Sequence, residues 1–204
     1  MFDTLQHKIS ERLHALKPGQ VVVLSDFEDI SEAKTTSKIL TRLSDLHLVD
    51  KLMRGMFFKK TAEVKEPTLR EIAEGIARAN GWHIAPCGDT ALYALGILKN
   101  KPTECTFVSD GTNRSYQIGE QTLVFKHTAA RYVSAFSQQT ATIVQALKAI
   151  GPHITPERLM EELKPILTKI DFKRLAEECK KAPAWIAALL ISFCTLYENM
   201  NGIL

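Results

Sequence analysis

The sequence predicts an α+β protein in two parts: a first domain at residues 1–62 and a mixed domain at residues 67–204 that ends in helices. The chain has 204 residues, a length that suits two small domains. Hydrophobic residues make up 45% of it and charged residues 24%, the composition of a globular protein that can bury a core. Hydrophobic patterns of helices and strands alternate up to Ser134, and helical patterns follow from there.

The first domain begins with a helix and a short strand. Apolar residues recur at helical spacing over residues 2–16, and Lys17-Pro18-Gly19 ends this helix. The β-branched run Val21 to Val23 predicts a buried strand, and Ser25-Asp26 can cap a brief helix that starts at Phe27. The residues from Ser31 to Lys34 are expected to form a turn.

A second helix and a hairpin complete this domain. From Thr35 onward, Ile39, Leu40, Leu43 and Leu46 share one stripe of a helix, which leaves a polar face opposite. Residues 48–50 and 53–59 then predict two strands around a bend at Gly55, where glycine supplies conformational freedom. This order of elements is typical of a winged helix-turn-helix, with the hairpin as the wing.

A winged helix-turn-helix places its second helix in the major groove of DNA, while its wing holds phosphates. Candidate groove contacts are the polar residues of that helix: Thr35, Thr36, Lys38, Thr41 and Arg42. Of these, Arg42 is the best candidate for reading a guanine. The wing segment 51–60 contains four cations and no acid, and its candidate phosphate contacts are Lys51, Arg54, Lys59 and Lys60. The alternative is that these are solvated charges on a module that docks onto a protein without reading DNA.

The second domain is predicted to mix helices and strands after a linker near residues 61–66. A capping-box pattern at residues 67–71 starts a helix that ends at Asn80-Gly81. A short helix at 91–98 and strands at 105–109, 115–118 and 122–126 follow, and the helical remainder is broken at Gly151-Pro152, at Pro156, at 170–171 and at Pro183. This domain has a candidate second basic surface, and the alternative is that its charges are ordinary solvated charges on a hairpin. The residues concerned are Arg114, Lys126, His127 and Arg131. The stripe around Trp185 favours a C-terminal helix that docks onto its own domain over a dimer face.

Several other functional classes find little support in the sequence. The four cysteines form no CxxC pair, so neither a metal site nor a disulfide framework is expected. Ser109 or Ser115, His127 and Asp110 are the pieces of a nucleophilic triad, but no GxSxG, HExxH or phosphate-binding glycine loop accompanies them. The start of the chain has no signal-peptide pattern, and the longest apolar stretch is too short to span a bilayer. We therefore expect a cytoplasmic protein that is not an enzyme and has no cofactor or metal.

The run from Val22 to Lys59 resembles the N-terminal winged helix of AbiEi-type antitoxins, with Arg54-Gly55-Met56-Phe57 as its arginine-glycine-aromatic wing. Further stretches resemble shorter members of the same family: residues 88–97, 108–119, 125–128 and 181–185. The resemblance implies a bacterial repressor that binds double-stranded DNA at its own promoter and counteracts a nucleotidyltransferase-like toxin in a type IV pair, without necessarily touching that toxin. A homodimer on an inverted repeat is the natural form of such a repressor. The entry to the wing, Lys51-Leu52-Met53-Arg54, has fewer arginines than the family pattern. The affinity for DNA or the sequence of the bound DNA site would therefore differ from that of typical members.

Overall fold

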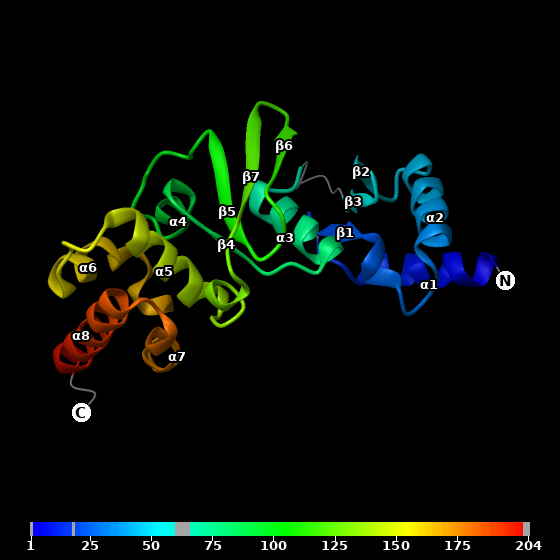
Figure 1. Cartoon of the computed structure of the whole chain (residues 1–204). Helices are drawn as coiled ribbons and strands as arrows, with labels where there is room; N and C mark the ends of the chain where they lie inside the picture. The colour runs from blue at the N-terminus through cyan, green and yellow to red at the C-terminus, as the bar shows by residue number, and fades with distance from the viewer. Residues whose placement is uncertain (1, 18, 60–65, 202–204) are drawn as a thin grey trace. The chain divides into compact units, whose positions relative to one another are not determined.

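The structure is a computed structural model that describes residues 2–17, 19–59 and 66–201. The chain divides into two compact units, Met1–Trp82 and His83–Leu204. Each unit combines helices with one small sheet, and the second ends in a long helix (Figure 1). The fold is therefore α+β, as the sequence predicts. Among the described helices, none has the length and apolar character needed to cross a membrane.

The first unit follows the predicted order of elements closely. Its elements are α1 (Phe2–Ala15), β1 (Val21–Val23), the 3-10 helix η1 (Leu24–Phe27), α2 (Ala33–Asp45), β2 (Asp50–Met53), β3 (Met56–Phe58) and α3 (Leu69–Asn80). The three strands form an antiparallel sheet in the order β1-β3-β2. Three details differ from the prediction. Helix α2 begins at Ala33, inside the expected turn, and the brief helix expected from Phe27 is a 3-10 helix that ends there. The strands expected at 48–50 and 53–59 lie at 50–53 and 56–58.

The core of the first unit lies between the helices and the sheet. The residues that fill it come from α1, β1, η1, α2, the segment before β2, and β3: Ile9, Leu13, Val22, Phe27, Ile39, Leu40, Leu43, Val49 and Phe57. Their spacing along α1 and α2 is helical, so burial of one stripe leaves the opposite face of each helix exposed. All three residues of β3 are buried because this strand is central in its sheet.

Helix α3 belongs to the first unit by its packing. Thr68 caps its start, where the Thr68 hydroxyl accepts from the Glu71 amide and the Glu71 carboxylate accepts from the Thr68 amide, which is the predicted capping box. A Cβ placed on Gly75 would lie 2.6 Å from Cγ1 of Val21, so the helix backbone approaches β1 as only a glycine permits. The unit boundary therefore follows Trp82, whereas the sequence interpretation placed this helix in the second domain.

The second unit is built on a four-stranded sheet. Its strands are β4 (Ile84–Pro86), β5 (Glu104–Ser109), β6 (Arg114–Ile118) and β7 (Gln121–His127), in the order β4-β5-β7-β6. β5 and β7 pair in parallel, while the other two pairings are antiparallel. The sequence predicts β5, β6 and β7 to within one residue at each end, but it does not predict β4.

Helices make up the remainder of the second unit (Figure 1). They are α4 (Asp89–Ala94), η2 (Ala130–Tyr132), α5 (Gln138–Ile150), α6 (Pro156–Glu162), η3 (Lys164–Lys169), α7 (Phe172–Glu178), η4 (Cys179–Lys181) and α8 (Ala184–Asn201). Ile186, Leu190 and Phe193 of α8 are fully buried in one core with Leu147 of α5 and Leu163. The C-terminal helix thus docks onto its own unit, as expected. Pro156 stands at the first turn of α6, a position where proline starts a helix.

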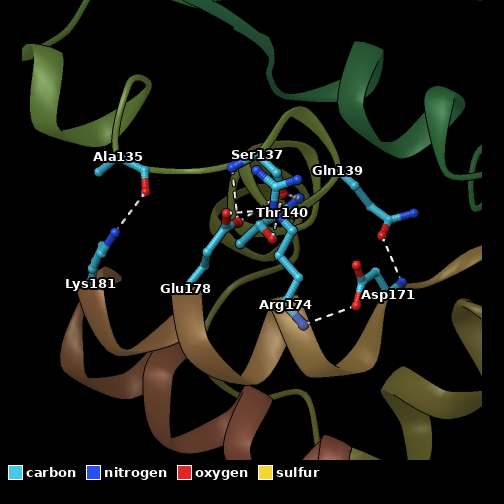
Figure 2. Close-up of polar contacts among 8 residues, drawn as sticks. All are labelled: Ala135, Ser137, Gln139, Thr140, Asp171, Arg174, Glu178 and Lys181. Atoms are coloured by element: carbon cyan, nitrogen blue, oxygen red, sulfur yellow. Dashed lines mark hydrogen bonds and ion pairs between the residues drawn. The ribbon is translucent and has the colours of Figure 1, made fainter.

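A hydrogen-bonded carboxylate joins α5 to α7 in this unit (Figure 2). The Glu178 carboxylate accepts from the backbone amide and the hydroxyl of Ser137, each at 2.8 Å, and from Nε of Arg174 at 2.8 Å. Partial burial acts to raise the pKa of Glu178, but the hydrogen bonds from Arg174, Thr140 and Ser137 outweigh it and lower the pKa to about 2. Nearby, the Asp171 amide donates to Oε1 of Gln139 at 3.0 Å and adds a second link between the two helices.

Candidate nucleic-acid interface

Helix α2 has one buried face and one cationic face. Ile39, Leu40 and Leu43 are buried in the core. The exposed side chains on the other side include Lys34, Lys38, Thr41 and Arg42. Three cations and a hydroxyl thus lie on the solvent face of this helix together with the exposed carboxylate of Asp45 at its last residue, and the face keeps an excess of positive charge.

Thr36 is a correction to the predicted set of groove contacts. Its side chain is completely buried, and its hydroxyl lies 2.8 Å from that of Ser31. A residue in this position cannot touch a base. It instead ties the first turn of α2 to the turn that precedes the helix.

The two other threonines of the predicted set stay closer to the surface. Thr35 is half-buried, and Thr41 is exposed and donates its hydroxyl proton to the Ser37 carbonyl at 2.8 Å. The Thr41 oxygen can therefore act as an acceptor toward an outside donor, such as the amino group of a base.

Lys34 is a cation that the sequence interpretation missed. The sequence places Lys34 in the turn before α2, but the helix begins at Ala33, two residues before the expected start, and Lys34 is exposed on its first turn. The signal that could have found it is the spacing from Lys34 to Lys38 and Arg42, which repeats every four residues along one side of a helix.

The hairpin of β2 and β3 carries two of the four residues that the sequence predicts to contact phosphates. Lys51 on β2 and Arg54 at the turn are both exposed. Met53 pairs with Met56, so Arg54-Gly55 forms a two-residue turn, and Gly55 adopts φ +74° with the Leu24 side chain 3.4 Å from where its Cβ would be. The turn therefore holds Arg54 at the tip of the hairpin.

Lys59 has an intramolecular role that the sequence did not suggest. Its ammonium group donates to the carbonyl of His14 at 2.9 Å and to that of Leu16 at 3.4 Å, at the C-terminal end of α1. A cation at this end of a helix satisfies carbonyls that lack a helical partner. The ammonium group predicted to contact phosphate is thus engaged inside the unit. Lys60 lies outside the described residues.

Two arginines hold the turn that leads into α2. The guanidinium of Arg12 donates to both carboxylate oxygens of Asp29, at 2.6 and 2.7 Å, and this bidentate hydrogen bond lowers the pKa of Asp29 and raises that of Arg12. Arg78 at the end of α3 pairs with Asp26 at 3.3 Å. Neither arginine belonged to the predicted site, because their partners are distant in sequence.

Helix α2 ends beside an apolar surface. His47 adopts a left-handed conformation with φ 58°, and the Leu48 amide bonds the Leu43 carbonyl at 3.0 Å to close the helix. Leu46 and Leu48 are large apolar residues that stay 58% and 49% exposed. Leu48 lines a pocket of about 230 Å³ together with residues that include Leu13, His14 and His47.

The four residues of the predicted second basic surface lie in the second unit. Arg114 is on β6, Lys126 and His127 are on β7, and Arg131 is on η2, all of them exposed. The Arg131 guanidinium lies 4.9 Å from the centre of the Tyr132 ring, and the ammonium of Lys148 lies 5.0 Å from the same centre. The structure thus adds Lys148 and Tyr132 to the neighbourhood of Arg131.

The pieces of the nucleophilic triad do not form a hydrogen-bonded chain. Asp110 pairs with His83, whose Nδ1 is 2.8 Å from the Asp110 carboxylate. His127 directs its Nδ1 to the Gly111 carbonyl at 2.7 Å, and the Ser109 hydroxyl accepts from the Gly111 amide. Ser115 is exposed on β6. These contacts explain the polar residues as supports of the loop after β5.

The cysteines and the other candidate metal ligands are dispersed. Cys105, Cys179 and Cys194 are buried and Cys87 is half-buried, all with free thiols. Burial raises the pKa of Cys87, although Lys126 and Lys148 act to lower it. In the described part of the chain, no three His, Cys, Asp or Glu side chains gather in a way that could hold a metal ion.

Comparisons with known proteins place the chain in a family. No curated protein matches it significantly. Among solved structures, the crystal structure of the Rv2827c protein from Mycobacterium tuberculosis is similar over 94% of this chain and 77% of that one, with 16% identity and a TM-score of 0.43. The model of a family of unknown function, DUF6088, matches residues 8–175, and the chain therefore belongs to that family.

Proposed function

We propose that the first unit is a winged helix-turn-helix that binds double-stranded DNA and that the protein acts as a transcriptional repressor. The observation that carries this proposal is the solvent face of α2, where Lys34, Lys38 and Arg42 are exposed on one side of a helix whose other side is fully packed. The exposed Lys51 and Arg54 of the following hairpin give a second set of cations in the same unit.

The chemistry of these side chains favours DNA over an acidic protein surface. Exposed lysines and arginines bind phosphates through charge, and an arginine can also donate two hydrogen bonds to a guanine edge. The hydroxyl of Thr41 sits between Lys38 and Arg42 in sequence and adds an acceptor for a base amino group. A helix face of this composition can therefore both hold a duplex and distinguish its bases.

A mobility-shift titration tests the proposal. The probe is the DNA upstream of the protein's own gene, with scrambled DNA of equal length as competitor. We expect specific binding that weakens as salt rises, by roughly 0.9 in log–log slope for each phosphate contact. The variant Lys38→Gln/Arg42→Gln should lose this binding, while the control Lys164→Gln/Lys169→Gln, which removes the same charge from exposed positions of the second unit, should retain it. Equal binding by both variants would contradict the assignment of α2.

The apolar surface after α2 favours a second candidate function. Leu46 and Leu48 are exposed, Leu48 lines a pocket of about 230 Å³, and contiguous exposed apolar patches are where proteins dock. In this alternative the unit docks onto a partner protein without reading DNA. Absence of any salt-dependent DNA binding in the titration above would favour it.

The antitoxin role is a separate proposal that rests on the resemblance of the sequence motifs to AbiEi-type antitoxins. It is tested in two steps. A neighbouring gene for a nucleotidyltransferase-like protein should be present, and expression of that neighbour alone should arrest growth. Co-expression of this chain should restore growth, and the variant Lys38→Gln/Arg42→Gln should still restore it if the two roles are independent. Failure of the parent chain to restore growth would remove the antitoxin role and leave the repressor role unaffected.

A further inference from the structure

The turn between β1 and α2 is held from two sides by arginines of other helices. From α1, the Arg12 guanidinium donates to the Asp26 carbonyl at 2.8 Å and grips the Asp29 carboxylate with both of its terminal nitrogens. From α3, the Arg78 guanidinium donates to the Val21 carbonyl at 2.8 Å and approaches both oxygens of the Asp26 carboxylate at 3.3 Å. Three segments far apart in sequence therefore meet at this turn.

Asp26 is the residue on which these contacts converge. Its carboxylate also accepts from the Val23 amide at 2.9 Å, which fixes the start of η1. The side chain is 29% exposed and satisfies a backbone amide and an arginine at once, whereas the exposed pair of Arg70 and Glu74 links neighbouring turns of a single helix. Asp26 thus joins β1, η1 and α3 in one hydrogen-bonded group.

The residues that follow Asp26 in the turn connect it to α2 by packing and by a hydrogen bond. Phe27 follows Asp26 directly, is fully buried, and lies in the same core as Ile39 and Leu43 of α2. The Arg12 guanidinium lies over the ring of Phe27, 5.8 Å from its centre. Further along, the hydroxyl pair of Ser31 and Thr36 fastens the turn to the first turn of the helix.

We propose that Asp26 is a positioning residue for α2: together with Arg12 and Arg78 it sets the orientation of that helix relative to the sheet. This inference rests on the proposed function, because orientation matters when α2 and the β2–β3 hairpin must engage one duplex together. An anionic side chain repels phosphates, so any contribution of Asp26 to DNA binding acts through α2 and not through contact.

The first test separates specific from non-specific binding. The variant Asp26→Asn keeps the shape of the side chain and removes its charge. The variant Arg78→Gln removes the guanidinium that pairs with Asp26. With a duplex selected from a random library by the parent protein, we expect either variant to lower the ratio of specific to non-specific affinity about tenfold. Affinity for scrambled DNA should stay within about twofold, because both variants keep the exposed cations of α2 and of the β2–β3 hairpin. Arg70→Gln on the same helix is the matched control and should leave the ratio unchanged.

The second test does not involve DNA. Residual dipolar couplings of backbone amides report the orientation of α2 relative to β3 in the free protein. We expect them to change in Asp26→Asn and to stay as in the parent in Arg70→Gln. Arg78→Lys, which keeps the charge but loses the two-pronged contact, serves in place of Asp26→Asn if that variant does not fold.

The outcomes distinguish the two proposals. Unchanged couplings in α2 would overturn the positioning role, and so would a fall in Tm with parallel losses of specific and non-specific affinity, since Asp26 would then be a general stability residue. If the parent protein selects no duplex from the library, the proposed function fails, while the couplings still decide whether Asp26 orients α2.

Discussion

The hydroxyl of Thr36 lies 2.8 Å from the hydroxyl of Ser31, inside the protein and at the first turn of α2. The bond joins a completely buried side chain to a half-buried one. A polar group that leaves water in this way contributes to stability only while its partner is present. The contact therefore gives a clear expectation for substitution.

Thr36→Val should destabilise the first unit without changing base preference directly. The variant preserves shape and loses the hydroxyl, and a lost buried hydrogen bond of this kind costs about 1–2 kcal/mol. Chemical denaturation followed by circular dichroism measures the change. Thr41→Val, at an exposed position of the same helix, is the control and should lower stability much less.

Arg42→Ala and Arg54→Gln should weaken DNA binding in different ways. Loss of Arg42 should relax the preference for one base pair, by about 1–3 kcal/mol of discrimination, because a guanine edge loses two donors. Loss of Arg54 should weaken binding to all DNA sequences alike. It should also reduce the slope of log affinity against log salt concentration by roughly 0.9. Titrations of a selected site and its single-base variants over a range of salt measure both effects. Identical losses on every sequence for Arg42→Ala would show that Arg42 contacts only phosphate.

His47→Gly should stabilise the end of α2. His47 has φ 58°, and a left-handed residue with a Cβ costs about 1–2 kcal/mol, while glycine costs about 0.5–1 kcal/mol of backbone entropy. The difference favours glycine by about 0.5 kcal/mol. Gly55→Ala, at φ +74°, should change stability in the opposite direction. Thermal unfolding of both variants checks the pair, and a lower Tm for His47→Gly would contradict the expectation.

Gly75→Ala should destabilise the first unit although alanine favours helices. The added Cβ would lie 2.6 Å from Cγ1 of Val21, closer than real contacts allow, so α3 and β1 must separate. Overpacking of this kind costs about 1–3 kcal/mol, which exceeds the gain of about 1 kcal/mol in helix propensity. Denaturant unfolding measures the net effect, and Ala79→Gly on the exposed side of α3 calibrates the propensity contribution.

The second unit should lose stability as the pH falls from about 4.5 to about 2. The pKa of Glu178 is lowered in the folded state, to about 2, so its stabilising effect is complete above its unfolded value and disappears as the carboxylate is protonated. A shift of this size corresponds to at most about 3 kcal/mol. Glu178→Gln should lower stability at pH 7 and flatten the pH dependence over this range. Glu177→Gln, at the exposed neighbouring position, should leave the curve nearly unchanged.

The sequence predicts the elements of the first unit well because their hydrophobic spacing is local. The same spacing also indicates that Thr36 is buried. Thr36 lies three, four and seven residues before Ile39, Leu40 and Leu43, so it shares their buried stripe. Lys34 could be found in the same way, from its four-residue distance to Lys38.

Other features of the candidate site depend on contacts that sequence spacing does not reveal. The carbonyls bound by Lys59 lie at the C-terminal end of α1 and just after it, 45 and 43 residues earlier in the chain. The ion pair of Arg78 and Asp26 joins residues that are 52 positions apart in the sequence. Strand β4 is three residues long and contains Pro86, which argues against a strand unless it lies at a sheet edge, as β4 does.

The strand order β4-β5-β7-β6 has a consequence for how the second unit assembles. β6 and β7 are joined by the two-residue turn Gly119-Glu120, so their pairing requires only local chain closure. β5 comes earlier in the chain but pairs in parallel with β7. The β5–β7 pairing therefore closes a longer stretch of chain than the β6–β7 turn does. The β6–β7 hairpin can therefore form by itself, as can the antiparallel β4–β5 pair, and a ribosome must release β7 before β5 and β7 can join the two pairs into one sheet.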